Sequence, residues 1–165
     1  MSPQPGVPVL RRVVLDTTDV RALAEFYRWL LDLRYRPGDE HPGADVPDPR
    51  GQDWLMLRRL DGSTALAFQK VEQLPPATWP NGPHPQMLHL DLTLPDRAEL
   101  DAAHQGALAL GARVLMDRSD DEEEEPLGVY ADLAGHPFCI FVVWPLVAEP
   151  PSPARLARLG TARRG

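Results

Sequence analysis

The stretch RRVVLDTTDVRALAEFYRWLLDLRY (residues 11–35) decides the fold, because LHLDLTLPDRAELDAAHQGALALGA (residues 88–112) repeats its pattern later in the chain. In each copy an alternating apolar run, typical of a strand with one buried face, ends at an aspartate, Asp19 or Asp96. Each aspartate can accept hydrogen bonds from the free N–H groups that begin a helix. Apolar residues then recur at helical spacing, more weakly in the second copy, which ends at Gly111. The sequence therefore predicts two copies of a strand, a cap and an amphipathic helix.

Short strand patterns follow each predicted helix and complete two modules of the type β-α-β-β-β. They fall at residues 34–36, 54–59 and 64–71 in the first half, and at 112–117, 129–133 and 137–143 in the second. The long loops 37–51 and 118–127 occupy the same place in both halves. We expect an α+β fold of two tandem modules, about 10–74 and 86–145, with an N-terminal tail (1–9) and a Pro/Arg-containing C-terminal tail (146–165).

Composition narrows the compartment and the partners. The net charge is −7, most of it from the acidic run at 120–125, and no basic stripe interleaved with aromatic residues suggests nucleic acid binding. The single cysteine excludes an intrachain disulfide and fits a reducing compartment. The N-terminus lacks the apolar segment of a signal peptide, and the longest apolar run, 138–144, is too short to span a bilayer. We expect a cytoplasmic protein without nucleic acid or membrane partners.

The stretch MLHLDLTLPD (residues 87–96) places polar residues where a buried strand does not need them. Its leucines at 88, 90, 92 and 94 should pack beneath a helix, which leaves His89 and Asp91 on the other face. The first strand likewise turns Arg12 and Asp16 away from its helix. These polar side chains either form a satisfied ion network without a ligand, or line a small-molecule site that includes Trp54.

The ordered set of motifs resembles one known superfamily. RRVVLDTTDVRALAEFYRWLL, DWLMLRRLDG, LAFQKV, LHLDLTLPD, ALGARVL and YADLAGHPFCIFV resemble the vicinal oxygen chelate (VOC) superfamily, in its glyoxalase-like branch with the bleomycin resistance proteins and dioxygenases. The resemblance covers about residues 10–145. It implies that the two modules form an open, cupped barrel with helices on the outside. It also implies a divalent metal in the cup that acts as a Lewis acid, with ligands from the first and last strands of each module.

The positions that match those metal ligands are occupied by Arg12, Gln69, His89 and Cys139. His89 and Cys139 suit a divalent ion, and Gln69 offers a neutral oxygen. Arg12 stays protonated and would repel a cation. We therefore expect a degenerate form of the conventional metal site; a single Zn, Mn, Fe or Ni ion on His89, Gln69 and Cys139 is the alternative.

Two functions are compatible with these residues and with the resemblance. The first is a glyoxalase-like lyase, isomerase or related activity on a small polar or anionic molecule, with His89 as general base beside Asp16 or Asp91. Arg12 would clamp a carboxylate or phosphate, and Trp54, Gln69 and Asp91 would complete the ligand site. The second is a non-catalytic protein that sequesters a small molecule, as drug-resistance members do. The resemblance also implies a homodimer.

His136 follows a glycine in a tight turn, where the polarity of the turn alone explains the presence of a histidine.

Overall fold

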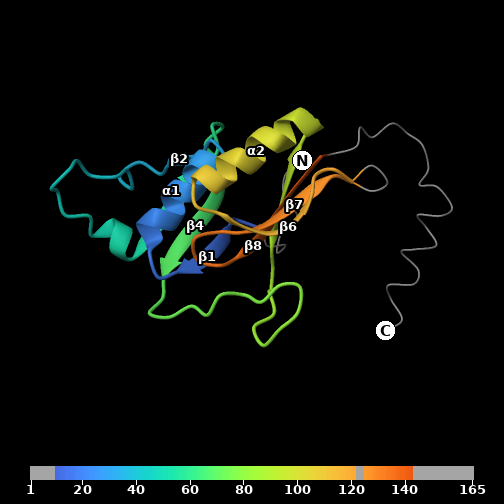
Figure 1. Ribbon diagram of the computed structural model, residues 1–165. Coiled ribbons are helices and arrows are strands. Elements are labelled where there is room, and N and C mark those ends of the chain that lie inside the picture. The colour runs from blue at the N-terminus through green and yellow to red at the C-terminus, as the bar shows by residue number, and fades with distance from the viewer. Residues whose placement is uncertain (1–9, 122–124, 143–165) are drawn as a thin grey trace, which may run out of the picture.

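The computed structural model describes residues 10–121 and 125–142 (Figure 1). Both predicted tails and residues 122–124 of the acidic run lie outside the described residues. The first module comprises β1 (Val13–Thr17), α1 (Val20–Leu30), β2 (Arg34–Tyr35), the short 3-10 helix η1 (Arg50–Gln52), β3 (Trp54–Arg58) and β4 (Thr64–Lys70). The second comprises β5 (Leu90–Leu94), α2 (Arg97–Ala109), β6 (Arg113–Arg118), β7 (Leu127–Ala131) and β8 (Pro137–Val142).

Each module forms its own four-stranded mixed sheet, in the order β1-β4-β3-β2 and β5-β8-β7-β6. The first strand of each module runs parallel to the last one, and the other pairs are antiparallel. The predicted α+β class with two βαβββ modules is confirmed. Within the described residues no strand pair joins the two sheets, so any barrel they form stays open.

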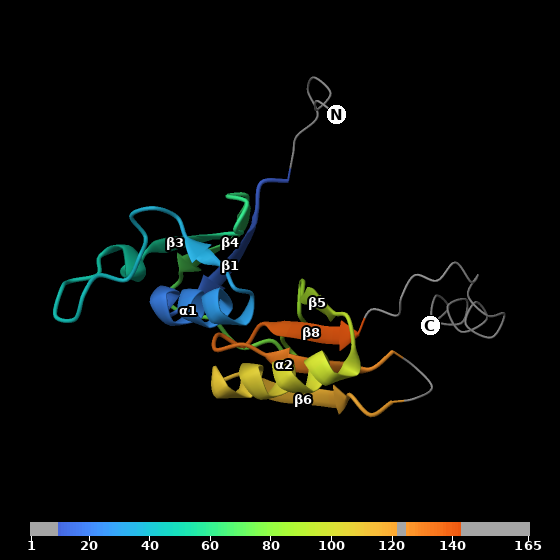
Figure 2. The same cartoon turned by 90° about the horizontal axis from the view of Figure 1, so that it is seen from above.

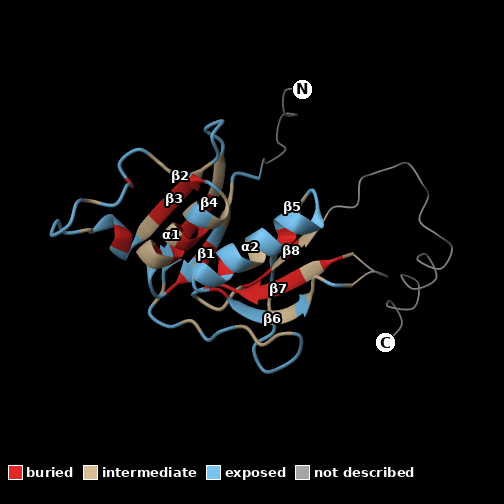
Figure 3. Ribbon diagram, turned by 45° about the horizontal axis from the view of Figure 1, so that its top comes forward, coloured by how far each residue is buried: buried red, intermediate tan, exposed pale blue. Residues whose placement is uncertain are grey.

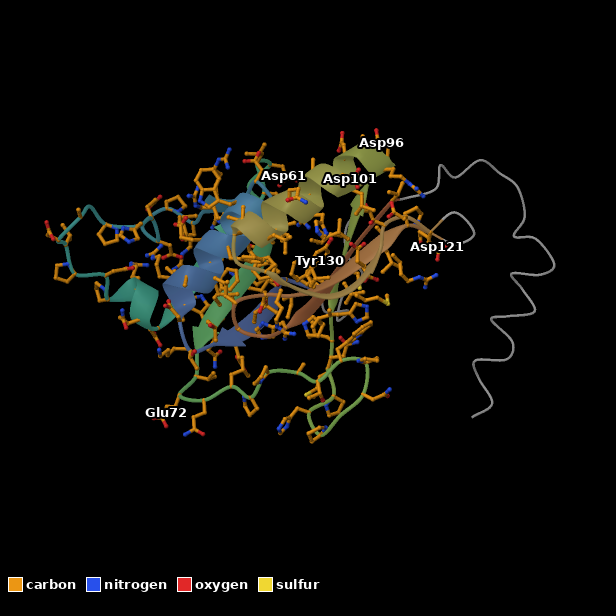
Figure 4. The ribbon with its side chains drawn as sticks, viewed as in Figure 1. Asp61, Glu72, Asp96, Asp101, Asp121 and Tyr130 are labelled. Carbon is orange, nitrogen blue, oxygen red and sulfur yellow. The ribbon has the colours of Figure 1, made fainter. Side chains whose placement is uncertain are left out.

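The predicted aspartate caps begin both helices. Asp19 Oδ1 accepts the N–H of Ala22 at 3.0 Å, and Asp96 Oδ1 accepts the N–H of Glu99 at 2.9 Å. Asp96 marks this end of α2 in Figure 4. Each cap satisfies a backbone donor that has no partner within the helix, which stabilises the start of the helix by about 1 kcal/mol.

Both helices end in the same left-handed turn, although only one of them has a glycine there. Gly111 follows α2 with φ of 100°, and the N–H of Ala112 then donates to Ala107 O at 3.0 Å. Asp32 takes the equivalent place after α1 with φ of 48°, and the next N–H closes the same bond, to Arg28 O at 3.0 Å. The first module therefore holds an aspartate in a conformation that favours glycine.

One hydrophobic core spans both modules. Tyr27 of α1 stacks on Phe68 of β4, with ring centroids 5.9 Å apart, and meets Phe138 of β8 edge-on at 6.4 Å. Phe138 in turn stacks on Tyr130 of β7 at 5.3 Å. Helix α1 also contacts α2, and Figures 1 and 2 show each helix lying against its own sheet. Because these aromatic rings join the modules, each module's sheet is positioned by the other.

The predicted alternation of faces largely holds. The leucines at 90, 92 and 94 pack against the core, whereas His89, Asp91 and Thr93 are exposed. In Figure 3 the buried residues are prominent on β3 and β7, whereas β6 is exposed or intermediate. The prediction that Leu88 also packs beneath the helix was wrong, because its side chain is 52% exposed. β5 begins only at Leu90, so the alternation does not extend back to residue 88.

Arginines tie the long loop between β2 and β3 to the first module. Arg21 of α1 donates two hydrogen bonds to the Asp48 carboxylate, at 2.7 and 3.0 Å. The side chain of Asp39 is fully buried and accepts from Arg36 at 2.8 Å and Arg50 at 2.9 Å. These contacts indicate a fixed connection.

Among the described residues, no helix is long and apolar enough to cross a bilayer.

Candidate functional site

Three chemically reactive side chains gather at the start of β5 and on β8. Asp91 and Cys139 are partners in the parallel β5–β8 pair, so their side chains share the sheet face opposite α2. His89, just before β5, places its Nε2 3.2 Å from Asp91 Oδ1. One donor atom from each of the three lies within 4.8 Å of the others. We call His89, Asp91 and Cys139 the His-Asp-Cys cluster.

The thiol of Cys139 is held in its protonated form. Burial raises its pKa to about 11, and the Asp91 carboxylate contributes to this through its negative charge and by accepting a hydrogen bond from the thiol. At neutral pH Cys139 is therefore a poor nucleophile, since the thiolate is the reactive form. It can ligate a metal only when the ion displaces its proton.

The donor atoms of the His-Asp-Cys cluster fit a divalent metal ion. Nitrogen, oxygen and sulfur are all donors that zinc accepts, and three protein donors with a fourth position left open is the arrangement of catalytic zinc sites. A tetrahedral ion requires donor atoms roughly 3.4–3.7 Å apart, so rotation of exposed side chains would have to bring the three together. Gln69, which we predicted as a ligand, lies on β4 in the other sheet, and the structure places Asp91 beside His89 and Cys139 instead.

The other predicted residues of the first module form a row across its sheet. Gln69 of β4 is the register partner of Asp16 on β1 and of Trp54 on β3. Asp16 and Gln69 are exposed, and Trp54 is half-buried. Within the described residues, neither Asp16 nor Arg12 has a hydrogen bond or ion pair with His89. The four-residue ion network that we considered is therefore reduced to the His89–Asp91 pair.

Arg12 lies among other arginines. Loss of hydration and, after it, the positive charges of Arg11, Arg36 and Arg58 lower the pKa of its guanidinium. The Nε atoms of Arg12 and Arg58 are buried and find no hydrogen-bond partner among the described residues. We call Arg11, Arg12, Arg36 and Arg58 the arginine cluster. Among the described residues, Arg36 is the only member of this cluster that forms an ion pair, with Asp39, so the cluster carries excess positive charge.

A cavity of about 300 Å³ lies between the modules, at the segment that connects them. Its walls come from β1, from the connecting segment and from the turn before β8. Asp16 lines it, as do three polar residues that sequence reasoning did not select: His84, Gln86 and His136. The spacing of Asp132 and His136 around Gly135 was the available sequence signal, because a side chain pair can close such a turn.

Comparison with known proteins gives one family and many similar structures. A family model described as a glyoxalase-like domain matches residues 12–141. The comparison with curated proteins gives no match. A glyoxalase/dioxygenase from Nostoc punctiforme superposes with a TM-score of 0.59 at 17% identity, over 86% of this chain and 96% of that chain.

Two further structures have comparable similarity. A glyoxalase/bleomycin resistance protein/dioxygenase family enzyme from Burkholderia phytofirmans PsJN gives a TM-score of 0.58 at 15% identity, over 81% of this chain and 98% of that one. A mutant of the fosfomycin resistance protein FosX from Listeria monocytogenes, complexed with Mn(II) and 1S,2S-dihydroxypropylphosphonic acid, gives 0.58 at 14% identity, over 84% and 95%. At such low identity these structures establish the shared fold alone.

Proposed function

Because the chain belongs to the glyoxalase-like domain family, we propose that it binds or transforms a small polar, anionic molecule on the sheet faces opposite its helices. The conventional metal site of the superfamily is degenerate in this proposal. The observation that carries the anionic ligand class is the arginine cluster, whose two buried Nε donors find no acceptor in the part of the chain that the structure describes.

A buried donor without a partner is costly, so the cluster favours an occupant that supplies acceptors. Planar guanidinium groups match the oxygen pairs of carboxylates and phosphates. An anion between Arg12 and Arg58 would satisfy their Nε donors and reduce the repulsion between like charges. The Listeria relative is complexed with a phosphonic acid, which supports an anionic ligand class for this fold.

The register of the first sheet supports a single ligand surface. Arg12 precedes β1 and Arg58 ends β3, on either side of β4. By alternation both side chains share the face of Asp16 and Trp54, which lie toward the other end of the same strands. The anionic end of a ligand would lie at the arginines. Its remaining part would meet the row formed by Asp16, Gln69 and Trp54.

The His-Asp-Cys cluster supplies the residues for chemistry in this proposal. His89 would act as general base, oriented by Asp91 at 3.2 Å. A divalent ion, if bound, would be held by His89, Asp91 and Cys139 and would polarise a ligand oxygen. Such a site would lack the ligand that the superfamily takes from the first strand, where Arg12 stands. A glyoxalase-like lyase or isomerase reaction is the enzymatic form of the proposal.

Sequestration without catalysis is the alternative function. The protonated Cys139 thiol favours it, because the group then offers no nucleophile at neutral pH. Incubation with methylglyoxal and glutathione, followed by product detection, separates the enzymatic form from simple binding for the glyoxalase reaction. A homodimer, which the resemblance implies, is a further proposal that a mass measurement in solution tests.

Calorimetric titration of the full chain with inorganic phosphate and with methylphosphonate tests the anionic ligand class. We expect saturable binding that weakens at least tenfold in Arg12→Gln and in Arg58→Gln. Arg59→Gln is the matched control, because it removes the same charge from the exposed residue next in the chain. Equal affinities in all three variants, or no saturable binding by the unmodified protein, would refute the arginine cluster as the anion site.

A further inference from the structure

The cavity between the modules contains a histidine whose ring is held by a hydrogen bond to a buried aspartate. His136 Nδ1 lies 2.9 Å from Asp132 Oδ2. The same oxygen accepts a hydrogen bond from the Tyr27 hydroxyl at 2.9 Å, and Asp132 Oδ1 accepts the backbone N–H groups of Ala134 and His136 at 2.9 and 3.0 Å. Asp132 is buried, at 6% exposure, and Tyr27 is fully buried. The ring of His136 is therefore anchored across the interface of the two modules.

This anchoring determines which nitrogen of His136 can bind something else. An ionised carboxylate only accepts hydrogen bonds, so the ring donates to Asp132 through a proton on Nδ1. In the neutral ring Nε2 then carries the free lone pair. His136 lines the cavity, and its side chain keeps 24% of its surface exposed. The nitrogen left for a ligand is Nε2, acting as an acceptor.

Two of the three other polar residues of the cavity offer hydrogen-bond acceptors. Asp16 contributes a carboxylate, and Gln86 Oε1 is buried without a hydrogen-bond partner among the described residues. The cavity's described lining residues include no lysine and no arginine. Most of the remaining wall is apolar, from Leu74, Pro75, Ala77, Pro85, Met87 and Leu88. Such a lining disfavours an anion and suits an apolar molecule that carries a hydrogen-bond donor.

We propose that this cavity is a second ligand site, for a small uncharged molecule with an apolar body and a hydroxyl group, and that His136 Nε2 accepts the hydroxyl hydrogen bond. The site shares Asp16 with the row that the anionic ligand would meet, but it contains none of the arginine cluster, which has excess positive charge. Its residues come from both modules, so it exists only when the modules are packed together. The volume of about 300 Å³ is at the lower end of the range for small-molecule sites.

Phenol is a suitable probe, with toluene as a control of the same shape and benzylamine as a cationic control. Titration of the full chain, labelled at histidine rings and methionine methyl groups, can be followed by NMR. We expect phenol to shift the His136 ring resonances and the Met87 methyl, and to bind about tenfold more tightly than toluene. Equal binding of phenol and toluene, or tighter binding of benzylamine, would overturn the proposed ligand class.

Substitution then tests the acceptor itself. His136→Phe keeps a ring but removes Nε2, so phenol affinity should fall about tenfold, to that of toluene. His104→Phe is the control, because His104 is half-buried against Tyr130 and lies outside the cavity lining. Unchanged phenol binding in His136→Phe would refute the role of Nε2. If His136→Phe does not fold, the decision rests on the unmodified chain, where a phenol-to-Met87 nuclear Overhauser effect must be seen.

Discussion

The carboxylate of Asp91 should control the reactivity of Cys139. Asp91→Asn removes the negative charge that raises the pKa of the thiol and leaves the contribution of burial in place. With a pKa of about 11, the thiolate makes up only about 10⁻³ of the cysteine at pH 8. Each unit by which the pKa falls increases this fraction about tenfold. We expect Asp91→Asn to accelerate alkylation of Cys139 at pH 8 by a factor of roughly ten.

Alkylation by iodoacetamide, followed by intact mass, measures this rate directly because the chain contains a single cysteine. Asp101→Asn is the control, since it removes the same charge from an exposed position on α2. The increase should be specific to Asp91→Asn, and it should shrink toward pH 11, where the thiol of the unmodified protein also ionises. An alkylation rate in Asp91→Asn equal to or below that of the unmodified protein would refute the claim that the Asp91 charge raises the pKa of Cys139.

Three further outcomes follow from the structure. Asp32→Gly should raise the free energy of unfolding by about 1 kcal/mol in urea denaturation, because glycine adopts the left-handed turn without strain; the exposed ion pair with Arg34 that it loses contributes little. Tyr27→Phe should lower that free energy by about 1–3 kcal/mol, because Asp132 then loses a buried donor. Protein purified without chelator should hold well below one divalent ion per chain by elemental analysis, and one ion per chain that disappears in His89→Ala would contradict the degenerate metal site.

Local sequence patterns were enough to predict the two modules. Asp19 and Asp96 begin the helices as expected, since a cap depends only on residues within one turn of it. The alternation of leucine with polar residues around Asp91 likewise predicted which face of β5 is exposed, since a strand has a period of two residues. Both signals depend on near neighbours in the chain, so a single sequence contains them.

The site was less predictable, because its contacts join distant parts of the chain. Tyr27 and Asp132 are 105 positions apart, and no local pattern indicates their hydrogen bond. The register shift at Leu57/Arg58 changes how the end of β3 meets β4, at the position of Arg58 in the arginine cluster. We considered an ion network of Arg12 with Asp16 and His89 as one of two alternatives because all three lie on helix-free faces, but those faces belong to separate sheets.

The two modules differ electrostatically at equivalent places, which explains why one fold can present two kinds of surface. Arg12 and His89 occupy matching positions before the first strand of each module, yet Arg12 lies among positive charges and His89 beside a carboxylate. The core residues of both modules are constrained by the shared aromatic packing, whereas the helix-free faces contribute little to that core. Substitutions on those faces therefore cost little stability and change mainly what is bound.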